Sequence, residues 1–537
     1  MRRLLPLLAC LLLPAAAAAR PPNVVLILTD DQGFGDIRSH GNASIDTPHL
    51  DQLAADGARL DRFYVSPVCA PTRAALLTGR YHLRTGVHGV TRGAEDMREE
   101  ETTLAEVFKA NGYATGCFGK WHNGAHYPRD PNGQGFDEFL GFCGGHWLLY
   151  YDTPLQHNDS LVQTRGYITD VLTDAALDFI DQHQDSPFFC YVPYNAPHSP
   201  WIAPPELWEK YKAKGLATDE EACAYAMVEN IDTNAGRILA RLRERGLEHD
   251  TIVIFTTDNG PNSDRYNSGM KGRKGSTHEG GVRVPMFIRW SGSIPSGVTL
   301  PDLSAHIDVL PTLVELCGLN FDAAADFPLD GISLAKPLRG LRIALPPRQL
   351  FVQYNGGEEV TPFKGAVRTP KDRAVWEGRQ KGRNAPWELY DMEADPGQKN
   401  DLAAKEPGVL AELSQAYDAW FAKVTSRGFG PLPISIGLEG RDTVMLQGHQ
   451  CILEQGGEPE SIRWANTKGF AHDWIAGWNR AEAYPRWPVD VKRGGRYRVA
   501  LEQAAPADRA GSRLEIRVGR VSLTTAALPV YDPEPLP

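Results

Sequence analysis

The sequence predicts an α/β protein in which a large, mostly parallel sheet is flanked by helices, followed by a small antiparallel subdomain and an appended all-β module. Up to about residue 300, short apolar, β-branched runs alternate with segments of helical periodicity, as in βαβ units. From residue 429 onward, alternating runs between glycine and proline turns favour β structure. A length of 537 residues exceeds what one hydrophobic core usually organises, so we expect several domains.

The first 19 residues have the layout of a secretory signal peptide. Arg2 and Arg3 precede an apolar run over residues 4–13, and small residues follow up to Ala19. We therefore expect an exported protein, periplasmic or extracellular, or lysosomal in a eukaryote. No later apolar run is long enough to predict a membrane span. The formal net charge of −11 argues against nucleic acid as a partner, so an anionic substrate would need a local basic pocket.

The predicted strands of the sheet end in polar residues. We expect strands over residues 23–29, 113–118, 188–192 and 251–257, and helices over 47–57, 102–112, 168–180 and 219–245. Ligands of open α/β sheets bind at the carboxyl ends of the strands. Asp30 and Asp31 follow the first strand, and Asp258 and Asn259 follow the last. These oxygen ligands suit a hard cation such as Ca²⁺ or Mg²⁺ and make zinc a poorer choice.

Cationic and imidazole groups follow the same strands. Lys120 and His122 come after the strand over residues 113–118, His198 follows the strand over 188–192, and a glycine-rich loop contains Lys274. Taken singly, each histidine could be a hydrogen-bonded structural residue, and the lysine loop could be a solvated surface segment. Together they form a set that would surround a tetrahedral anion.

A single segment, Ser66-Pro-Val-Cys-Ala-Pro-Thr-Arg-Ala-Ala-Leu-Leu-Thr-Gly-Arg80, is the most specific motif. Pro71 suits a first helical turn and Gly79 can end the helix, so Cys69 is expected at the N-terminal end, with Arg73 one turn later. Free N–H groups and the helix dipole favour an anion there. Alone, such a cysteine is more often a packing residue, but the odd number of cysteines beyond residue 19 suggests a special fate for one thiol.

The Cys-x-Pro-x-Arg core with its Thr-Gly-Arg end resembles the signature of the type I sulfatases of the alkaline phosphatase superfamily, in which the cysteine is oxidised to formylglycine. Other motifs agree with it in order: Asp-Asp, Gly-Lys-Trp-His, Pro-His, Asp-Asn-Gly and Lys-Gly-Ser-Thr-His-Glu-Gly-Gly. Ser276 stands where the family more often has threonine. The resemblance covers residues 23–285.

The resemblance implies a role for each motif residue. Asp30, Asp31, Asp258 and Asn259 would hold one Ca²⁺ beside matured Cys69; Arg73 and Lys120 would hold the formylglycine, His122 and His198 would move protons, and Lys274 would grip the sulfate. His146 is a further candidate near the sulfate. A formylglycine-generating enzyme would be needed for maturation.

The expected organisation is a signal peptide (1–19), a sulfatase catalytic domain (20–325), an α+β subdomain (326–428) and a β-sandwich-like module (429–537). The expected activity is hydrolysis of a sulfate ester, with a sulfated carbohydrate as substrate because an exported enzyme with a β module would meet glycans. A phosphomonoesterase or phosphonate esterase of the same superfamily is one alternative, and a non-catalytic glycan-binding protein is another. The four tryptophans of the module could form a sugar-stacking platform or a buried core: Trp464, Trp474, Trp478 and Trp487.

Overall fold

The computed structural model describes residues 20–528 apart from 323–326, 342, 355, 357–358, 381–382, 467 and 504–510. The predicted signal peptide lies outside the described residues. The chain forms two compact units: one contains the residues up to 435 together with 443–490, and the other contains 436–442 and the residues from 491 on. The domain boundaries drawn from the sequence stay predictions. None of the helices in the described part of the chain is long and apolar enough to cross a membrane.

The first unit is built on a ten-stranded sheet in the order β10-β2-β9-β8-β1-β7-β3-β4-β5-β6. Its strands are β1 (Asn23–Thr29), β2 (Ala58–Tyr64), β3 (Ala114–Lys120), β4 (Glu138–Phe142), β5 (Pro154–His157), β6 (Ser160–Gln163), β7 (Phe188–Pro193), β8 (Thr251–Thr257), β9 (Met286–Arg289) and β10 (Val298–Ala305). β1 pairs in parallel with β7 and β8, and β3 with β7 and β4. β9, β5 and β6 run antiparallel to their neighbours. The predicted large, mostly parallel sheet is confirmed.

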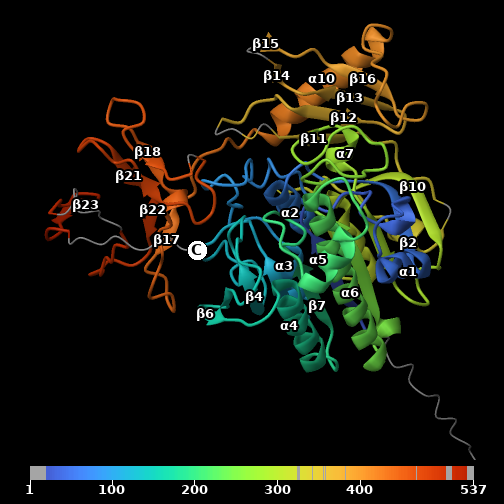
Figure 1. Ribbon diagram of the computed structural model, residues 1–537, viewed down its shortest axis with the longest axis horizontal. Helices are drawn as coiled ribbons and strands as arrows, with labels where there is room; N and C mark the ends of the chain where they lie inside the picture. Colours follow the sequence, from blue (N-terminus) through green and yellow to red (C-terminus); the bar gives the residue numbers. More distant parts are fainter. Residues whose placement is uncertain are drawn as a thin grey trace, which may run out of the picture. The chain divides into compact units, whose positions relative to one another are not determined.

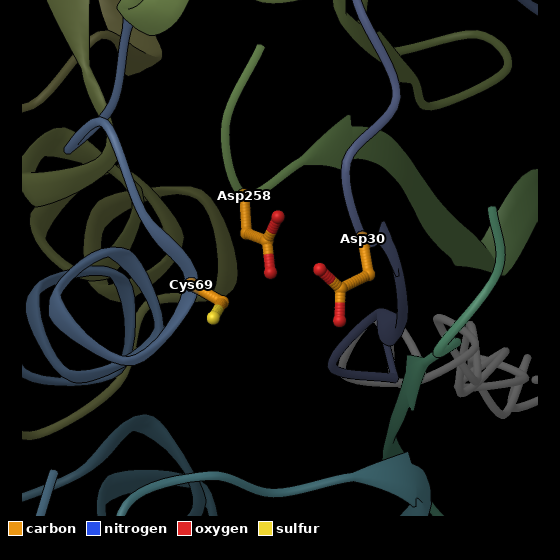
Figure 2. Close-up of side chains that lie close together, drawn as sticks. All are labelled: Asp30, Cys69 and Asp258. Carbon is orange, nitrogen blue, oxygen red and sulfur yellow. The ribbon is translucent and has the colours of Figure 1, made fainter. Parts of the chain in front are cut away.

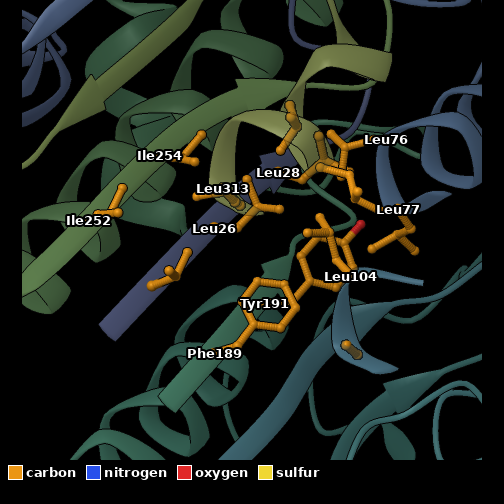
Figure 3. Close-up of a cluster of buried hydrophobic side chains, with 14 of the residues drawn as sticks. Leu26, Leu28, Leu76, Leu77, Leu104, Phe189, Tyr191, Ile252, Ile254 and Leu313 are labelled. Carbon is orange, nitrogen blue, oxygen red and sulfur yellow. The ribbon is translucent and has the colours of Figure 1, made fainter. Parts of the chain in front are cut away.

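Helices cover both faces of this sheet (Figure 1). The helices of this part of the chain are α1 (Pro48–Asp56), α2 (Cys69–Thr78), α3 (Leu104–Ala110), α4 (Ile168–Gln182), α5 (Pro205–Lys212), α6 (Asp219–Glu244), α7 (Glu279–Val282), α8 (Val309–Cys317) and α9 (Ala335–Leu338). Val24, Leu26 and Leu28 of β1 belong to a core shared with α2, α3 and α8 (Figure 3). Val25 and Ile27 belong to a second core with α1, α4 and α6. β1 is therefore buried on both faces, which its unbroken apolar sequence predicted.

A smaller antiparallel sheet forms a further layer of the same unit. It has the order β11-β12-β13-β16, with β11 (Leu350–Gln353), β12 (Gly365–Arg368), β13 (Asp372–Trp376) and β16 (Glu388–Asp391), and helix α10 (Pro407–Val424) packs against it. Its core also contains Tyr64 and Ala75 from β2 and α2, so the small sheet is joined to the large one by shared packing. The predicted antiparallel subdomain is confirmed.

Beyond residue 430 the described chain contains short antiparallel strand pairs. In the first unit β18 (Ile452–Glu454) pairs with β21 (Tyr484–Arg486), and β19 (Arg463–Trp464) pairs with β20 (Ile475–Ala476). In the second unit β23 (Glu515–Val518) pairs with β24 (Val521–Thr524). The remaining short strands are β14 (Arg379–Gln380), β15 (Arg383–Asn384), β17 (Ile434–Ile436) and β22 (Val489–Val491). The all-β character predicted for this region is confirmed, as small separate sheets.

Candidate active site

The acidic residues predicted as metal ligands meet at the carboxyl ends of two neighbouring parallel strands. Thr29 at the end of β1 lies opposite Thr257 at the end of β8. The backbone N–H of Asp31 donates to Asp258 Oδ1 at 3.2 Å, and Asn259 Nδ2 donates to Asp31 Oδ1 at 2.8 Å. All four predicted ligands are fully buried.

Two oxygens of this cluster have no hydrogen-bond partner among the described residues. They are Asp30 Oδ1 and Asn259 Oδ1, and both are buried. Unpaired buried carboxylate and amide oxygens are costly in a protein interior. Oxygen-only donors of this kind fit a hard divalent cation, so these residues could hold Ca²⁺.

Cys69 is the first residue of α2, where the sequence places it. Val68 before it is extended, and Gly79 ends the helix with a φ of 68°. The Cys69 Sγ and one carboxylate oxygen each of Asp30 and Asp258 lie within 4.8 Å of one another (Figure 2). Burial raises the pKa of the Cys69 thiol, although Lys120 opposes this shift. An unmodified Cys69 is therefore protonated at neutral pH and a weak nucleophile.

Arg73 lies one helical turn after Cys69 and fixes Asp258. Its Nε and Nη2 donate to Asp258 Oδ2 at 3.1 and 2.8 Å, and its Nη1 donates to the Lys120 carbonyl at 2.7 Å. Burial alone would lower the pKa of Arg73, but Asp258 raises it above its ordinary value. Burial and the neighbouring Asp30 raise the pKa of Asp258 to about 7 despite Arg73. The guanidinium stays charged and clamps this carboxyl group in place.

Two lysines bring positive charge to the carboxylates. Lys120 Nζ lies 2.5 Å from Asp30 Oδ2, and Lys274 Nζ lies 2.9 Å from Asp31 Oδ2. Burial would raise the pKa of Asp30, but Lys120, His198 and Arg73 hold it below its usual range. Burial would lower the pKa of Lys274, whereas Asp31 raises it. Both lysines therefore face the carboxylates that a cation would contact.

Three histidines lie in or next to the cluster. His198 Nε2 lies 3.7 Å from Asp31 Oδ2, and burial together with Lys274 lowers the pKa of His198. His122 Nε2 lies 2.9 Å from the Val90 carbonyl oxygen, and burial with Lys120 holds the pKa of His122 well below its usual range. The His146 ring centroid lies 5.2 Å from that of His198 and 6.4 Å from that of His122. His122 thus approaches the site next to His146, without a direct contact to the carboxylates among the described hydrogen bonds and ion pairs.

A small cavity beside the cluster is lined in part by residues that the sequence analysis did not identify. Its walls include Trp147, Tyr150 and Asn195 together with Asp30, Lys120 and His198. Tyr150 donates to the His198 carbonyl at 2.6 Å. Both side-chain polar atoms of Asn195 are buried and form no hydrogen bond within the part of the chain that the structure describes. Asn195 comes two residues after β7, so the strand-end argument used for Asp30 could have found it, whereas Trp147 and Tyr150 carry no local signal.

Comparison with known proteins identifies the family. The model of the Sulfatase family matches residues 22–319, and the model described as N-sulphoglucosamine sulphohydrolase, C-terminal, matches residues 273–416. Arylsulfatase A of Homo sapiens is 34% identical over 457 residues, which cover 73% of this chain and 86% of that protein. N-acetylgalactosamine-6-sulfatase of Canis lupus familiaris is 33% identical over 374 residues, covering 63% of this chain and 70% of that protein.

Solved structures agree with this assignment. Ps i-CgsB in complex with k-i-k-neocarrahexaose superposes with a TM-score of 0.70 at 28% identity, covering 77% of this chain and 95% of that one. The phosphonate monoester hydrolase of Agrobacterium radiobacter shares the fold, with a TM-score of 0.57 at 23% identity. Since the Sulfatase model spans more than half of the sequence, the chain belongs to the sulfatase family and is a sulfuric ester hydrolase, a type I sulfatase of the alkaline phosphatase superfamily.

Proposed function

We propose that the protein is an exported sulfatase that converts sulfate esters of carbohydrates to the alcohol and inorganic sulfate, using formylglycine made from Cys69 and one Ca²⁺. The observation that carries the proposal is the position of Cys69 at the start of α2, within 4.8 Å of the carboxylate oxygens of Asp30 and Asp258. A buried thiol with a raised pKa would be a poor catalyst there without modification.

Asp30, Asp31, Asp258 and Asn259 would hold the calcium ion. The two unpartnered oxygens, Asp30 Oδ1 and Asn259 Oδ1, favour this assignment because a cation would satisfy both. When bound, the ion would offset the carboxylate charge and attract the sulfate oxygens. The formylglycine hydrate would supply a hydroxyl nucleophile with a second hydroxyl for the release of sulfate.

Arg73, Lys120 and Lys274 would provide the fixed positive charge that a sulfate ester needs. Arg73 is held by Asp258 and by the Lys120 carbonyl, so its guanidinium needs no rearrangement during the reaction. The ammonium groups of Lys120 and Lys274 contact two neighbouring carboxylates, those of Asp30 and Asp31 respectively. Preorganised charge of this kind stabilises the charge that develops as the S–O bond breaks.

His122, His198 and Lys274 would move the protons. The leaving alcohol oxygen needs a proton when the S–O bond breaks, and Lys274 and His198 lie side by side near Asp31, where either could donate it. His122 is neutral at pH 7 because burial depresses its pKa, so it could accept a proton in the release step.

A carbohydrate substrate is supported by the relatives. N-acetylgalactosamine-6-sulfatase is named for a sulfated sugar, and Ps i-CgsB was solved with a neocarrahexaose. Export rests on the signal-peptide layout of residues 1–19.

The test combines mass spectrometry and kinetics on protein produced with a formylglycine-generating enzyme. We expect the peptide that contains residue 69 to carry the aldehyde and the protein to hydrolyse 4-nitrophenyl sulfate faster than 4-nitrophenyl phosphate. Cys69→Ala should lower kcat/KM by more than about 10³-fold because the nucleophile is lost. Cys223→Ala, which removes another buried free thiol on α6, is the matched control and should keep the activity. Full activity with an unmodified thiol, or faster phosphate hydrolysis, would contradict the proposal.

A further inference from the structure

Residues 443–490 lie beyond the ranges that both sulfatase models match, yet they belong to the same compact unit as the catalytic sheet. Within this segment we define the rim loop as residues 468–474. We propose that the rim loop forms a second wall of the substrate site and that Phe470 and His472 bind the sugar ring carrying the sulfate. The proposal rests on the carbohydrate sulfatase function proposed above. The rim loop would select the alcohol part of the substrate.

The rim loop has a fixed conformation. The Asp473 carboxylate, only 5% exposed, accepts hydrogen bonds from the backbone N–H groups of Asn466, Gly469 and Trp474 at 3.1, 3.2 and 2.9 Å. Three backbone donors on one buried carboxylate hold the turn without help from a ligand. A loop organised in this way presents its side chains in one orientation.

Further contacts fasten the loop to the catalytic part of the unit. The Thr91 hydroxyl donates to the Gly469 carbonyl. The Arg92 guanidinium lies over the Trp464 ring, 5.2 Å from its centroid. Earlier in the segment 443–490, the Met445 carbonyl oxygen lies 2.8 Å from Nε2 of His126 in the catalytic part. The segment is therefore attached to the catalytic part of the unit at several points.

The rim loop meets the active site through aromatic rings. The Phe470 ring centroid lies 4.5 Å from that of His146, which in turn lies 5.2 Å from that of His198. The His472 ring packs edge-on against Trp147 with centroids 5.0 Å apart, and Trp147 lines the cavity beside Asp30 and Lys120. Phe470 is thus separated by one imidazole from His198, a proposed proton donor to the leaving alcohol.

The rim loop also lies close to the loop that contains Gly144, His146 and Trp147. A Cβ atom added at Gly144 would lie 3.1 Å from the Cβ of Ala471. A side chain at position 144 would therefore press on the rim loop. Gly144 allows the loop that contains His146 and Trp147 to lie directly against it.

The exposed fractions suggest which part of the substrate the rim loop would meet. Cys69 and Lys120 are almost fully buried, so the sulfate end of a substrate would be enclosed. Phe470 and Trp147 are only partly buried, and His472 is exposed. Partly exposed aromatic rings with a polar tip beside them suit the apolar face and hydroxyl edge of a sugar ring. The rim loop would thus recognise the alcohol and leave the sulfate to the cationic cluster.

Steady-state kinetics on the matured enzyme would test this assignment. The substrates are the 6-sulfates of N-acetylgalactosamine, galactose and glucosamine, with inorganic sulfate as competitive inhibitor. For Phe470→Ala we expect KM for the best sugar sulfate to rise about threefold to tenfold, with kcat and the inhibition constant of inorganic sulfate unchanged. Phe470→Tyr should restore KM because it keeps the ring. Tyr484→Ala, which removes a 49% exposed aromatic side chain of β21 outside the rim loop, is the matched control and should leave KM unchanged.

Several results would overturn the proposal. They are an unchanged KM in Phe470→Ala, an equal rise in Tyr484→Ala, or a parallel loss of inorganic sulfate binding in Phe470→Ala. Failure of the proposed function would look different, because wild-type protein would then keep an unmodified Cys69, hydrolyse no sulfate ester, or hydrolyse 4-nitrophenyl sulfate but none of the sugar sulfates.

Discussion

At the scale of single residues, burial determines which groups in the site are charged. Burial and neighbouring cations hold the pKa of His122 well below its usual range and lower that of His146 to about 2, so both rings are neutral at pH 7. Arg73 and Lys274 stay charged because buried carboxylates compensate the cost of burying them. The positive charge of the site therefore comes from arginine and lysine and not from these two histidines.

Arg73 provides a test of this arrangement. Arg73→Lys would keep the charge but lose the two-pronged hydrogen bond to Asp258 and the bond to the Lys120 carbonyl. We expect kcat/KM to fall by about 10²-fold or more and the free energy of unfolding to fall by about 2 kcal/mol. Enzyme kinetics and urea denaturation measure the two effects.

Arg80→Lys is the matched control, because Arg80 is also buried and its Nη1 lies 2.9 Å from Glu101 Oε2 just after the same helix. This variant should lose stability but keep its activity per folded molecule. Similar loss of activity in both variants would show that Arg73 acts only through stability.

At the scale of helices and strands, local sequence signals place most elements within a few residues. β1 and β8 match the predicted ranges, while β3 runs two residues farther than predicted and includes Lys120. α3 begins at Leu104, inside the expected range of 102–112, and a capping box fixes its start, with Glu106 N–H donating to Thr103 Oγ1 and Thr103 N–H donating to Glu106 Oε2. Strand ends are less well predicted because ladder hydrogen bonds continue past the apolar run.

The capping box of α3 should contribute measurably to stability. Thr103→Ala removes the acceptor for the Glu106 N–H and the hydroxyl that donates to the Gln134 carbonyl at 2.7 Å. We expect the free energy of unfolding to fall by about 1 kcal/mol in chemical denaturation. Thr103→Ser keeps both hydrogen bonds and should stay within about 0.5 kcal/mol of the wild type. An equal loss in both variants would indicate that the threonine methyl group, not the cap, stabilises α3.

At the scale of the whole molecule, the candidate metal site joins distant parts of the chain. Asn259 and Asp31 are 228 positions apart and form a hydrogen bond just beyond the carboxyl ends of β1 and β8. Burial and, after it, repulsion by Asp30 raise the pKa of Asp258 there. A bound cation would remove this repulsion and stabilise the central strand pair.

Metal removal should therefore destabilise the fold as well as abolish activity. We expect EGTA to lower the thermal unfolding midpoint and added Ca²⁺ to restore it, with a gain of about 2.7 kcal/mol when free Ca²⁺ is 100 times its Kd. Asp31→Ala should abolish the calcium response, while Asp61→Asn, at a partly exposed surface carboxylate, should keep it. Differential scanning calorimetry measures the shift, and an identical midpoint with EGTA and with Ca²⁺ would contradict calcium binding.

The sequence by itself determined the class of fold and the main strands and helices, and it placed the acidic and cationic candidate residues at the strand ends where they meet, because apolar runs, caps and strand-end residues act over a few positions. Only the tertiary structure decided the order of the strands, with β9 antiparallel between β8 and β2, and the clamp between Arg73 and Asp258 across 185 positions. It also decided that Phe470 of the rim loop lies against His146. These contacts depend on which distant surfaces pack together, and no local periodicity carries that information.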